Sequence, residues 1–188
     1  LSYPFVFSYR DDLYMLPESS DQATVDLYRC TQFPDRWTYD RTLLKGIKAV
    51  DTTLCYHERL WWLFTCIAAH PQSPARDELF LFYADSPLSE EWTPHPLNPV
   101  ISDVRNARPA GRIIQQGERI LRPAQDCSKR YGYGLHLREI ETWNTAHFRE
   151  KTHTCLLPTG SRLGLHTINR QDQWVFVDIK VRKKKGTP

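Results

Sequence analysis

The sequence has 188 residues and a formal net charge of +3, with 40% apolar and 25% charged residues. This composition excludes a disordered chain, and the length fits one domain with a hydrophobic core. No apolar run is long enough to cross a bilayer, so we expect neither membrane insertion nor a signal peptide. Thirteen prolines and a single methionine favour many short strands and turns over long helices.

The cysteines and the basic residues near the C-terminus bear on location and partners. The five cysteines are odd in number and lack C-x-x-C spacing, which argues against a zinc site and a disulfide framework. This pattern favours a reducing compartment, so we expect a cytoplasmic location. Lys180 and the run 182–185 carry much of the positive charge. We expect a solvated tail at 183–188 and no nucleic-acid partner, with binding to nucleic acid or anionic lipid as the alternative.

The first part of the chain predicts a small antiparallel sheet. Two apolar runs at 4–9 and 13–18 flank a charged turn at 10–12, which is typical of a β-hairpin. Two further strands are expected at 25–30 and 38–44. Because the chain enters this strand pattern directly at its first residue, we expect a fragment that lacks N-terminal structure.

The same order of apolar runs and turns then recurs. The expected strands lie at 51–56, 60–67 and 79–84, then at 109–114, 119–123, 133–138 and 148–151, and finally at 165–169 and 174–179. The segment 71–77 predicts an exposed loop between two of them. The hairpin turns are spaced by about fifty residues, which is the range of propeller blades.

The repeat predicts how the sheets are arranged. A small antiparallel sheet has two apolar faces and cannot cover both alone, so equivalent sheets must stack around an axis. Other antiparallel β proteins with regular hairpins would also look periodic, but the aligned Trp37 and Trp92 favour a true repeat. The sequence therefore predicts an all-β propeller with about four blade equivalents. The expected units span 1–46, 47–101, 102–157 and 158–182, followed by the basic tail.

The densest charge lies in two stretches, 102–112 and 122–131, beside short apolar runs. Their charged residues are Asp103, Arg105, Arg108, Arg112, Arg122, Asp126, Lys129 and Arg130. A solvated turn is the common fate of such runs. Buried charges must be paired or hydrogen-bonded, however, and this density favours an ordered site.

The propeller register predicts where a site forms. In a blade the start of the first strand and the end of the second strand lie side by side, so these positions from all blades converge at one mouth of the channel. The residues placed there are Tyr3, Asp51, Arg108 and His166 from strand starts, and Glu18, the region 66–68, Gln125 and Asp126 from strand ends. A polar mouth over an apolar stack is typical of a small-molecule site.

These residue types suit a sugar, because carboxylates and arginines hydrogen-bond hydroxyl groups. Glycoside cleavage needs two carboxyl groups that flank the bond, and Asp51 with Glu18 or Asp126 could supply them. Arg108 would hold a nearby acid ionised, which favours binding a phosphate or carboxylate over proton donation. No helical histidine pair, Gly-x-Ser-x-Gly motif, glycine-rich phosphate loop or Asp-x-Asp motif is present, so we expect no metal and no cofactor.

Several runs carry a resemblance to a known family. The chain resembles the propeller domain named after the N-terminal part of glucosamine inositolphosphorylceramide transferase. The runs that carry the resemblance are 3–7 (YPFVF), 14–19 (YMLPES), 25–29 (VDLYR), 33–37 (FPDRW), 103–112 (DVRNARPAGR) and 122–127 (RPAQDC). That domain is similar to the five-bladed propellers of family 43 glycosidases and occurs alone or fused to glycosyltransferase domains. The resemblance implies a five-bladed ring, with a complete blade preceding Leu1.

The glycosidase pattern transfers poorly to these positions. Those enzymes begin successive inner strands with Asp-Pro, Asp-Pro and Glu-Gly-Pro. Here the second aligns with Tyr3-Pro4, Asp51-Thr52 follows, and Arg108 stands where a general acid would be sought. The resemblance therefore implies a carbohydrate site whose chemistry differs from ordinary retaining or inverting hydrolysis.

We predict a carbohydrate-active domain that binds, and transforms by glycosyl transfer or a glycosidase-like reaction, a glycan or a sugar-phosphate-type molecule. Its expected catalytic residues are Asp51 as the essential carboxylate, with Glu18 and Asp126 in support. Its expected substrate-binding residues are Tyr3, Arg105, Arg108, Arg112, Arg122 and His166. The alternative is a non-catalytic carbohydrate-binding or scaffolding propeller that positions a partner glycosyltransferase.

Overall fold

The computed structural model describes residues 2–68, 70 and 73–182. In this part of the chain the strands form four antiparallel sheets, and the single helical segment is the 3-10 turn η1 (Ser20–Gln22). The all-β prediction is confirmed. No helix among these residues is long and apolar enough to span a membrane. The expected tail at 183–188 lies outside the described residues.

Each sheet follows chain order from its first strand outward. The first sheet contains β1 (Phe5–Tyr9), β2 (Asp12–Leu16), β3 (Thr24–Gln32) and β4 (Arg36–Lys45). The second contains β5 (Ala49–His57), β6 (Leu60–Ile67), β7 (Glu78–Ala84) and β8 (Thr93–Pro94), with β9 (Ile101–Ser102) also paired to β7. The third contains β10 (Ile114–Gln116), β11 (Arg119–Asp126), β12 (Gly134–Trp143) and β13 (Phe148–Leu156). The fourth contains β14 (Arg162–Gln171) and β15 (Trp174–Val181).

Side-chain alternation explains why the sheets stack. In β6 the side chain of Leu63 packs into the core between the first and second sheets, while Trp62 and Phe64 pack into the core between the second and third. Successive side chains of a strand point to opposite faces, so an almost continuous apolar run buries both. Leu135 and Ile168 belong to a third core, between the third and fourth sheets.

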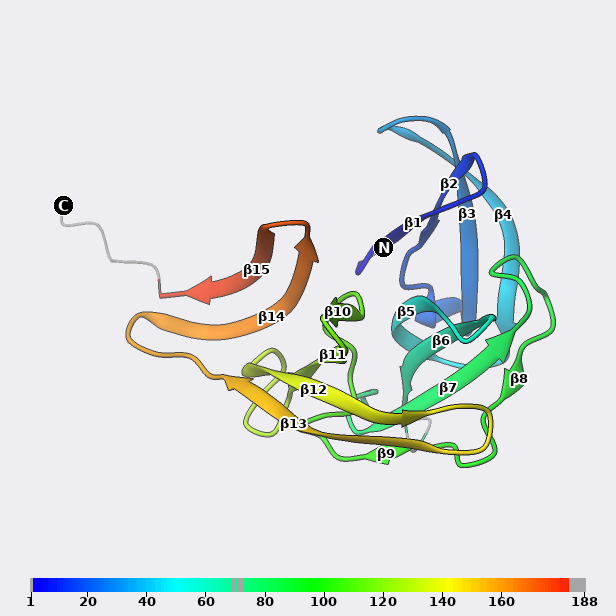
Figure 1. Cartoon of the computed structure of the whole chain (residues 1–188). Coiled ribbons are helices and arrows are strands. Elements are labelled where there is room, and N and C mark those ends of the chain that lie inside the picture. The colour runs from blue at the N-terminus through cyan, green and yellow to red at the C-terminus, as the bar shows by residue number, and fades with distance from the viewer. Residues whose placement is uncertain (1, 69, 71–72, 183–188) are drawn as a thin grey trace.

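The sheets lie face to face along an arc (Figure 1). The strands β1, β5 and β10 lie toward the inside of the arc, and β4, β8 and β13 toward the outside. Successive sheets that pack in this way around an axis form a β-propeller, so the predicted fold is confirmed. Residues near the entry to these inner strands meet, since Tyr3 hydrogen-bonds to Thr53 and Arg108 to Asp51.

One local expectation was wrong. The expected strand 109–114 is mostly irregular, and the regular strand β10 covers only Ile114–Gln116. Pro109 has no N–H to donate, and Gly111 has a φ of 139°, so this segment makes only an isolated bridge from Pro109 to Ala124. The loop expected at 71–77 is described from Ser73 onward, where Ser73 and Pro74 are exposed and Ala75 is buried.

Candidate functional site

Asp51 lies near the start of β5, and its side chain is buried at the inner side of the propeller. Its backbone has a φ of 51°, at an irregularity in the pairing of β5 with β6. A left-handed conformation costs a non-glycine residue about 1–2 kcal/mol, so neighbouring contacts must hold it. Asp51 Oδ2 accepts hydrogen bonds from Arg108 Nε at 2.6 Å and from Gln125 Nε2 at 2.7 Å. Gln125 of β11 and Arg108 of the irregular segment before β10 therefore fix this carboxylate.

Arg108 joins several parts of the site. Its Nη1 donates to the Ala75 carbonyl at 2.7 Å, and its Cζ lies 4.7 Å from the centre of the Tyr131 ring. Its Nη2 lies 3.9 Å from Glu18 Oε2. The guanidinium thus contacts two carboxylates, a carbonyl and an aromatic face, so it serves as the hub of the cluster and not as a free anion-binding group.

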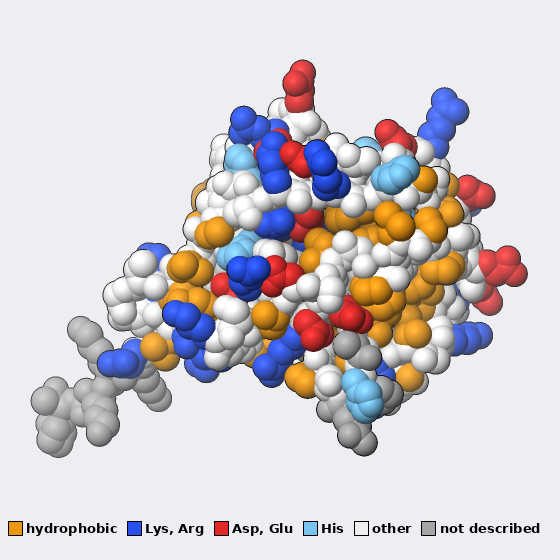
Figure 2. Space-filling model, turned by 90° about the horizontal axis from the view of Figure 1, so that it is seen from below, with side chains coloured by type: hydrophobic (Ala, Val, Ile, Leu, Met, Phe, Trp, Pro, Cys, Tyr) orange, Lys and Arg blue, Asp and Glu red, His pale blue; other side chains and the backbone are white. Residues whose placement is uncertain are grey.

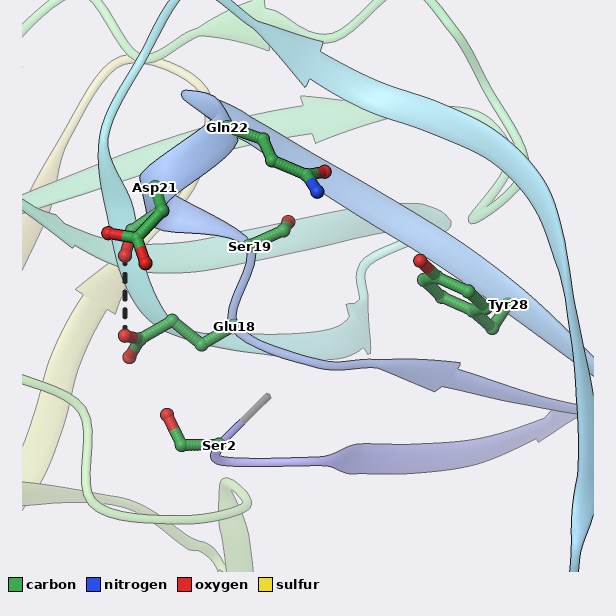
Figure 3. Close-up of a pocket in the computed structure, with 7 residues that line it drawn as sticks. Ser2, Glu18, Ser19, Asp21, Gln22 and Tyr28 are labelled. Carbon is green, nitrogen blue, oxygen red and sulfur yellow. Dashed lines mark hydrogen bonds between the residues drawn. The ribbon is translucent and has the colours of Figure 1, made fainter.

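Glu18 follows β2 and is the accessible acid of the pair. Burial raises the pKa of its carboxyl, and the charge of Asp51 raises it further. Glu18 lines a pocket of about 280 Å³ whose other walls are polar (Figure 3). The pocket's lining residues are Ser2, Glu18, Ser19, Ser20, Asp21, Gln22 and Tyr28. The Ser20 hydroxyl donates to Glu18 Oε1 at 3.3 Å, the bond that Figure 3 marks with a dashed line.

The geometry of the two acids limits the chemistry. Both carboxyl groups contact the Arg108 guanidinium, Asp51 Oδ2 at 2.6 Å from Nε and Glu18 Oε2 at 3.9 Å from Nη2. The charge of Asp51 also raises the pKa of Glu18. Asp51 is also only 1% exposed, whereas Glu18 borders the pocket. Glu18 is therefore the carboxyl that can meet a ligand.

The other two strand-start residues join the same cluster. The Tyr3 hydroxyl hydrogen-bonds to Thr53 Oγ1 at 3.1 Å, and burial together with the Asp51 charge raises the pKa of Tyr3. His166 Nε2 contacts the Tyr131 hydroxyl, and the Tyr131 ring lies against Arg108. The structure thus brings Asp51, Arg108 and His166 into one chain of contacts. The roles predicted for them stay predictions.

The structure does not bring Asp126 to this cluster. Its neighbour Gln125 points to Asp51, and successive residues of a strand face opposite sides. Asp126 instead accepts a hydrogen bond from the Ser128 amide at 2.9 Å and lies 3.7 Å from His136 Nε2. Of the two adjacent residues expected at this strand end, the structure brings Gln125 to Asp51 and turns Asp126 toward His136.

Three of the four expected binding arginines have partners elsewhere. Arg105 forms a bidentate pair with Asp103, with its Nη2 at 2.9 Å from Oδ2. Arg112 lies with its Cζ 4.6 Å from the centre of the Phe5 ring and donates to the Val6 carbonyl. The guanidinium of Arg122 is buried, and its Nε donates to Glu150 Oε2 at 2.8 Å. Of these arginines the structure places only Arg108 at the mouth.

Tyr131 is a site residue that the sequence did not single out, whereas Gln125 was expected at the mouth beside Asp126 but without a role of its own. Gln125 is fully buried, and its amide also donates to the Pro109 carbonyl at 3.0 Å. Every residue of β11 from Leu121 to Asp126 is buried, so burial does not distinguish Gln125 from its neighbours. Tyr131 lies in a turn between strands, and no local pattern distinguishes it from the nearby Tyr133.

The surface charges are mixed in sign. On the face shown in Figure 2, acidic and basic side chains are interspersed, and hydrophobic side chains gather at the side away from the C-terminal residues. Among the described residues, no group of three or more His, Cys, Asp and Glu side chains is arranged to hold a metal ion. The polar groups that the site offers are therefore its two acids, Arg108 and several hydroxyl groups.

Sequence comparison gives close matches. The family described as "Glucosamine inositolphosphorylceramide transferase 1, N-terminal" matches residues 1–169. The chain is 36% identical over 152 residues to glucosamine inositolphosphorylceramide transferase 1 of Oryza sativa subsp. japonica, and 34% identical over 152 residues to that of Arabidopsis thaliana. Each alignment covers 80% of this chain and 20% of the relative. The chain thus spans about a fifth of the length of the curated relatives it matches.

Structural comparison gives distant matches. An exo-β-1,3-galactanase from Phanerochaete chrysosporium has a TM-score of 0.63 at 10% identity, covering 97% of this chain and 44% of that one. A family 117 glycoside hydrolase from Zobellia galactanivorans has a TM-score of 0.58 at 13% identity, covering 85% and 47%. An exo-β-1,3-galactanase from Clostridium thermocellum has a TM-score of 0.54 at 14% identity, covering 85% and 38%. At these identities the likeness concerns the fold alone.

Proposed function

Because the chain belongs to the family of the N-terminal domain of glucosamine inositolphosphorylceramide transferase 1, we propose that it is a carbohydrate-active propeller domain. It binds a glycan or a sugar-phosphate-type ligand at the mouth formed by Glu18, Asp51 and Arg108. The family assignment confirms the resemblance that the sequence motifs indicated, and it supports a carbohydrate-related function. A five-bladed ring and a cytoplasmic location are further parts of the proposal. The first rests on the resemblance to family 43 glycosidases and the second on the cysteine pattern.

The observation that carries the proposal is Glu18 at the edge of the polar pocket. The hydroxyl, amide and carboxyl groups of this pocket suit the hydroxyl groups of a sugar ring. Glu18 has a raised pKa, which suits a group that donates a proton to a leaving oxygen. The charge of Asp51, which is hydrogen-bonded to Arg108 and Gln125, contributes to the raised pKa of Glu18. The essential carboxylate of the proposed reaction is therefore Glu18, supported by Asp51.

Replacement of Glu18 tests this function. In Glu18→Gln, turnover of β-linked oligosaccharides or nucleotide-activated sugars is expected to fall by about 10²- to 10⁴-fold, the usual contribution of a general acid. Binding of the same sugars, measured by calorimetry, is expected to persist because Gln keeps the hydrogen-bonding shape. Asp51→Asn is expected to lower turnover as well. Glu118→Gln, in an exposed turn, is the matched control and is expected to leave both measurements unchanged.

One observation favours the rival function of a non-catalytic binding or scaffolding propeller. Asp51 is 1% exposed and its carboxylate is held by Arg108 and Gln125, so it is not open to a glycosidic bond, which a glycosidase flanks with two carboxyl groups. Saturable glycan binding by the unmodified protein, together with no turnover of any sugar in the panel, would establish this alternative. Turnover that survives in Glu18→Gln would instead remove Glu18 from the mechanism.

A further inference from the structure

A second set of proton-carrying side chains adjoins Arg108 on the fourth sheet. His166 Nε2 contacts the Tyr131 hydroxyl, and His166 Nδ1 lies 3.4 Å from Asp178 Oδ2. The order is carboxylate, imidazole, hydroxyl. In this order the carboxylate orients the imidazole, and the imidazole accepts the proton of the hydroxyl group. For this to occur Nδ1 must carry the proton that faces Asp178, which leaves Nε2 free to accept.

Two glycines hold the set together. A Cβ atom on Gly164 would lie 2.1 Å from the Gly132 carbonyl oxygen, so only glycine allows the two backbones to come this close. The Leu165 amide donates to the same carbonyl at 3.2 Å. These contacts fix the turn that carries Tyr131 against β14, which carries His166. The juxtaposition of the two side chains is thus built into the backbone.

The three side chains line a pocket of about 280 Å³, separate from the one beside Glu18. Its lining residues are Tyr131, Gly132, Gly164, His166, Asp178 and Lys180. Burial raises the pKa of the Tyr131 phenol, although Arg108 opposes this effect. A phenol of this kind does not ionise by itself near neutral pH, so it can act as a base only if a neighbouring group takes its proton. His166 is in place to do so.

Tyr131 and Glu18 both adjoin the Arg108 guanidinium. The ring centre of Tyr131 is 4.7 Å from Cζ, and Glu18 Oε2 is 3.9 Å from Nη2. Glu18 as proton donor and Tyr131 as proton acceptor thus both contact the Arg108 guanidinium. Each of the two borders its own pocket. A group transfer between two bound molecules needs this arrangement, with a proton supplied on the leaving side and removed on the attacking side.

We propose that Tyr131, His166 and Asp178 form a proton relay that activates the hydroxyl group of an acceptor, a sugar or another polyol, bound in the pocket they line. The proposal rests on the proposed function, in which Glu18 acts on a donor sugar in the neighbouring pocket. Tyr131 is the catalytic residue of the relay, and His166 and Asp178 act through it.

The transfer step balances as follows in bonds and protons. The acceptor oxygen bonds to the anomeric carbon while the bond from that carbon to the leaving oxygen breaks. The acceptor proton passes to the Tyr131 oxygen, the Tyr131 proton passes to His166 Nε2, and the Glu18 proton passes to the leaving oxygen. Asp178 stabilises the imidazolium. His166 then releases its proton to water, and Glu18 takes one from water.

The relay is tested first without any substrate. The ¹⁵N resonances of the His166 ring in the purified protein report which nitrogen carries the proton. The expected result is a proton on Nδ1 and none on Nε2, with the Nε2 resonance shifted in Tyr131→Phe and the Nδ1 resonance shifted in Asp178→Asn. A proton on Nε2, or resonances that neither replacement changes, would overturn the relay. The control is Tyr133→Phe, whose ring lies by Lys129 and Arg130.

The base role is tested by turnover and binding together. Tyr131→Phe is expected to lower transfer to an acceptor sugar by about 10²-fold or more, with donor binding unchanged, and His166→Gln is expected to act alike. Full transfer activity in Tyr131→Phe would overturn the base role while leaving Glu18 catalysis intact. If the unmodified protein transfers no sugar, catalysis by both Glu18 and Tyr131 is refuted. The ring-nitrogen experiment then still decides whether the relay exists.

Discussion

At the scale of single residues, exposure separates the two acids of the mouth. Asp51 is held by two hydrogen-bond donors and is 1% exposed, whereas Glu18 borders a polar pocket and has a raised pKa. Both are carboxylates near strand ends, and residue type alone does not rank them. Their ranking follows from which one the surrounding sheets leave open to a ligand.

The raised pKa of Glu18 predicts a pH-dependent cost to stability. A carboxyl whose pKa is higher in the folded than in the unfolded protein favours folding when protonated, and this contribution is lost as pH rises through the folded pKa. Glu18→Gln is therefore expected to raise the free energy of unfolding at neutral pH, with the gain shrinking toward the ordinary value of 4.5 and below. Urea unfolding of both proteins from about pH 4 to about pH 8 measures this. A gain that is constant across this range would contradict the assignment.

At the scale of elements, β11 shows that two adjacent residues of one strand can have different roles. Gln125 pairs with Leu135 and Asp126 with Gly134, and their side chains leave the strand on opposite faces. The position and strand character of this segment follow from its apolar residues and its turn. The face that meets Asp51 depends on pairing with β12 and on the irregular segment before β10. The sequence therefore predicted that Gln125 and Asp126 end this strand at the mouth, but not which of the two meets Asp51.

The same sheet contains a buried charge network that predicts a large stability effect. Arg122 is 1% exposed and donates to Glu150 at 2.8 Å, and Arg138 donates to the same carboxylate at 2.8 Å. Because breaking a buried pair leaves an uncompensated charge, Glu150→Gln is expected to lower the free energy of unfolding by about 3 kcal/mol or more. The control is Glu141→Gln, whose partners are the exposed Arg149 and Lys151. Equal midpoints of urea unfolding for the two variants would refute the network's role.

At the scale of the whole molecule, the site exists because sheets from distant parts of the chain pack around one axis. Asp51 and Arg108 are separated by 57 positions in the sequence, and Tyr131 and His166 by 35. Each sheet supplies its own part of the mouth, and no sheet holds the cluster alone. The segment before β10 packs closely against the fourth sheet at Gly111, where the Ile168 amide donates to the neighbouring Ala110 carbonyl at 2.8 Å.

Gly111 therefore predicts a test of inter-sheet packing. A Cβ atom there would lie 2.0 Å from the Ile168 carbonyl oxygen, and the φ of 139° disfavours any side chain. Gly111→Ala is expected to destabilise the fold by about 3 kcal/mol or more and to speed amide exchange in β14. Gly117→Ala is the matched control, since its φ is also positive but the space around it is open, and it is expected to cost about 1–2 kcal/mol. Amide exchange in β14 that does not change in Gly111→Ala would contradict this packing.

The sequence by itself determined the strands, the hairpin turns and the propeller repeat, because these depend on neighbouring residues: apolar alternation, charged turns and prolines. It also placed Tyr3, Asp51, Arg108 and His166 at equivalent strand starts, which the structure joins through Thr53 and Tyr131. Only the tertiary structure decided which acid is open and which partners hold the buried one. Those properties depend on the face each strand presents and on the partner that the neighbouring sheet supplies, and neither is encoded in a local pattern.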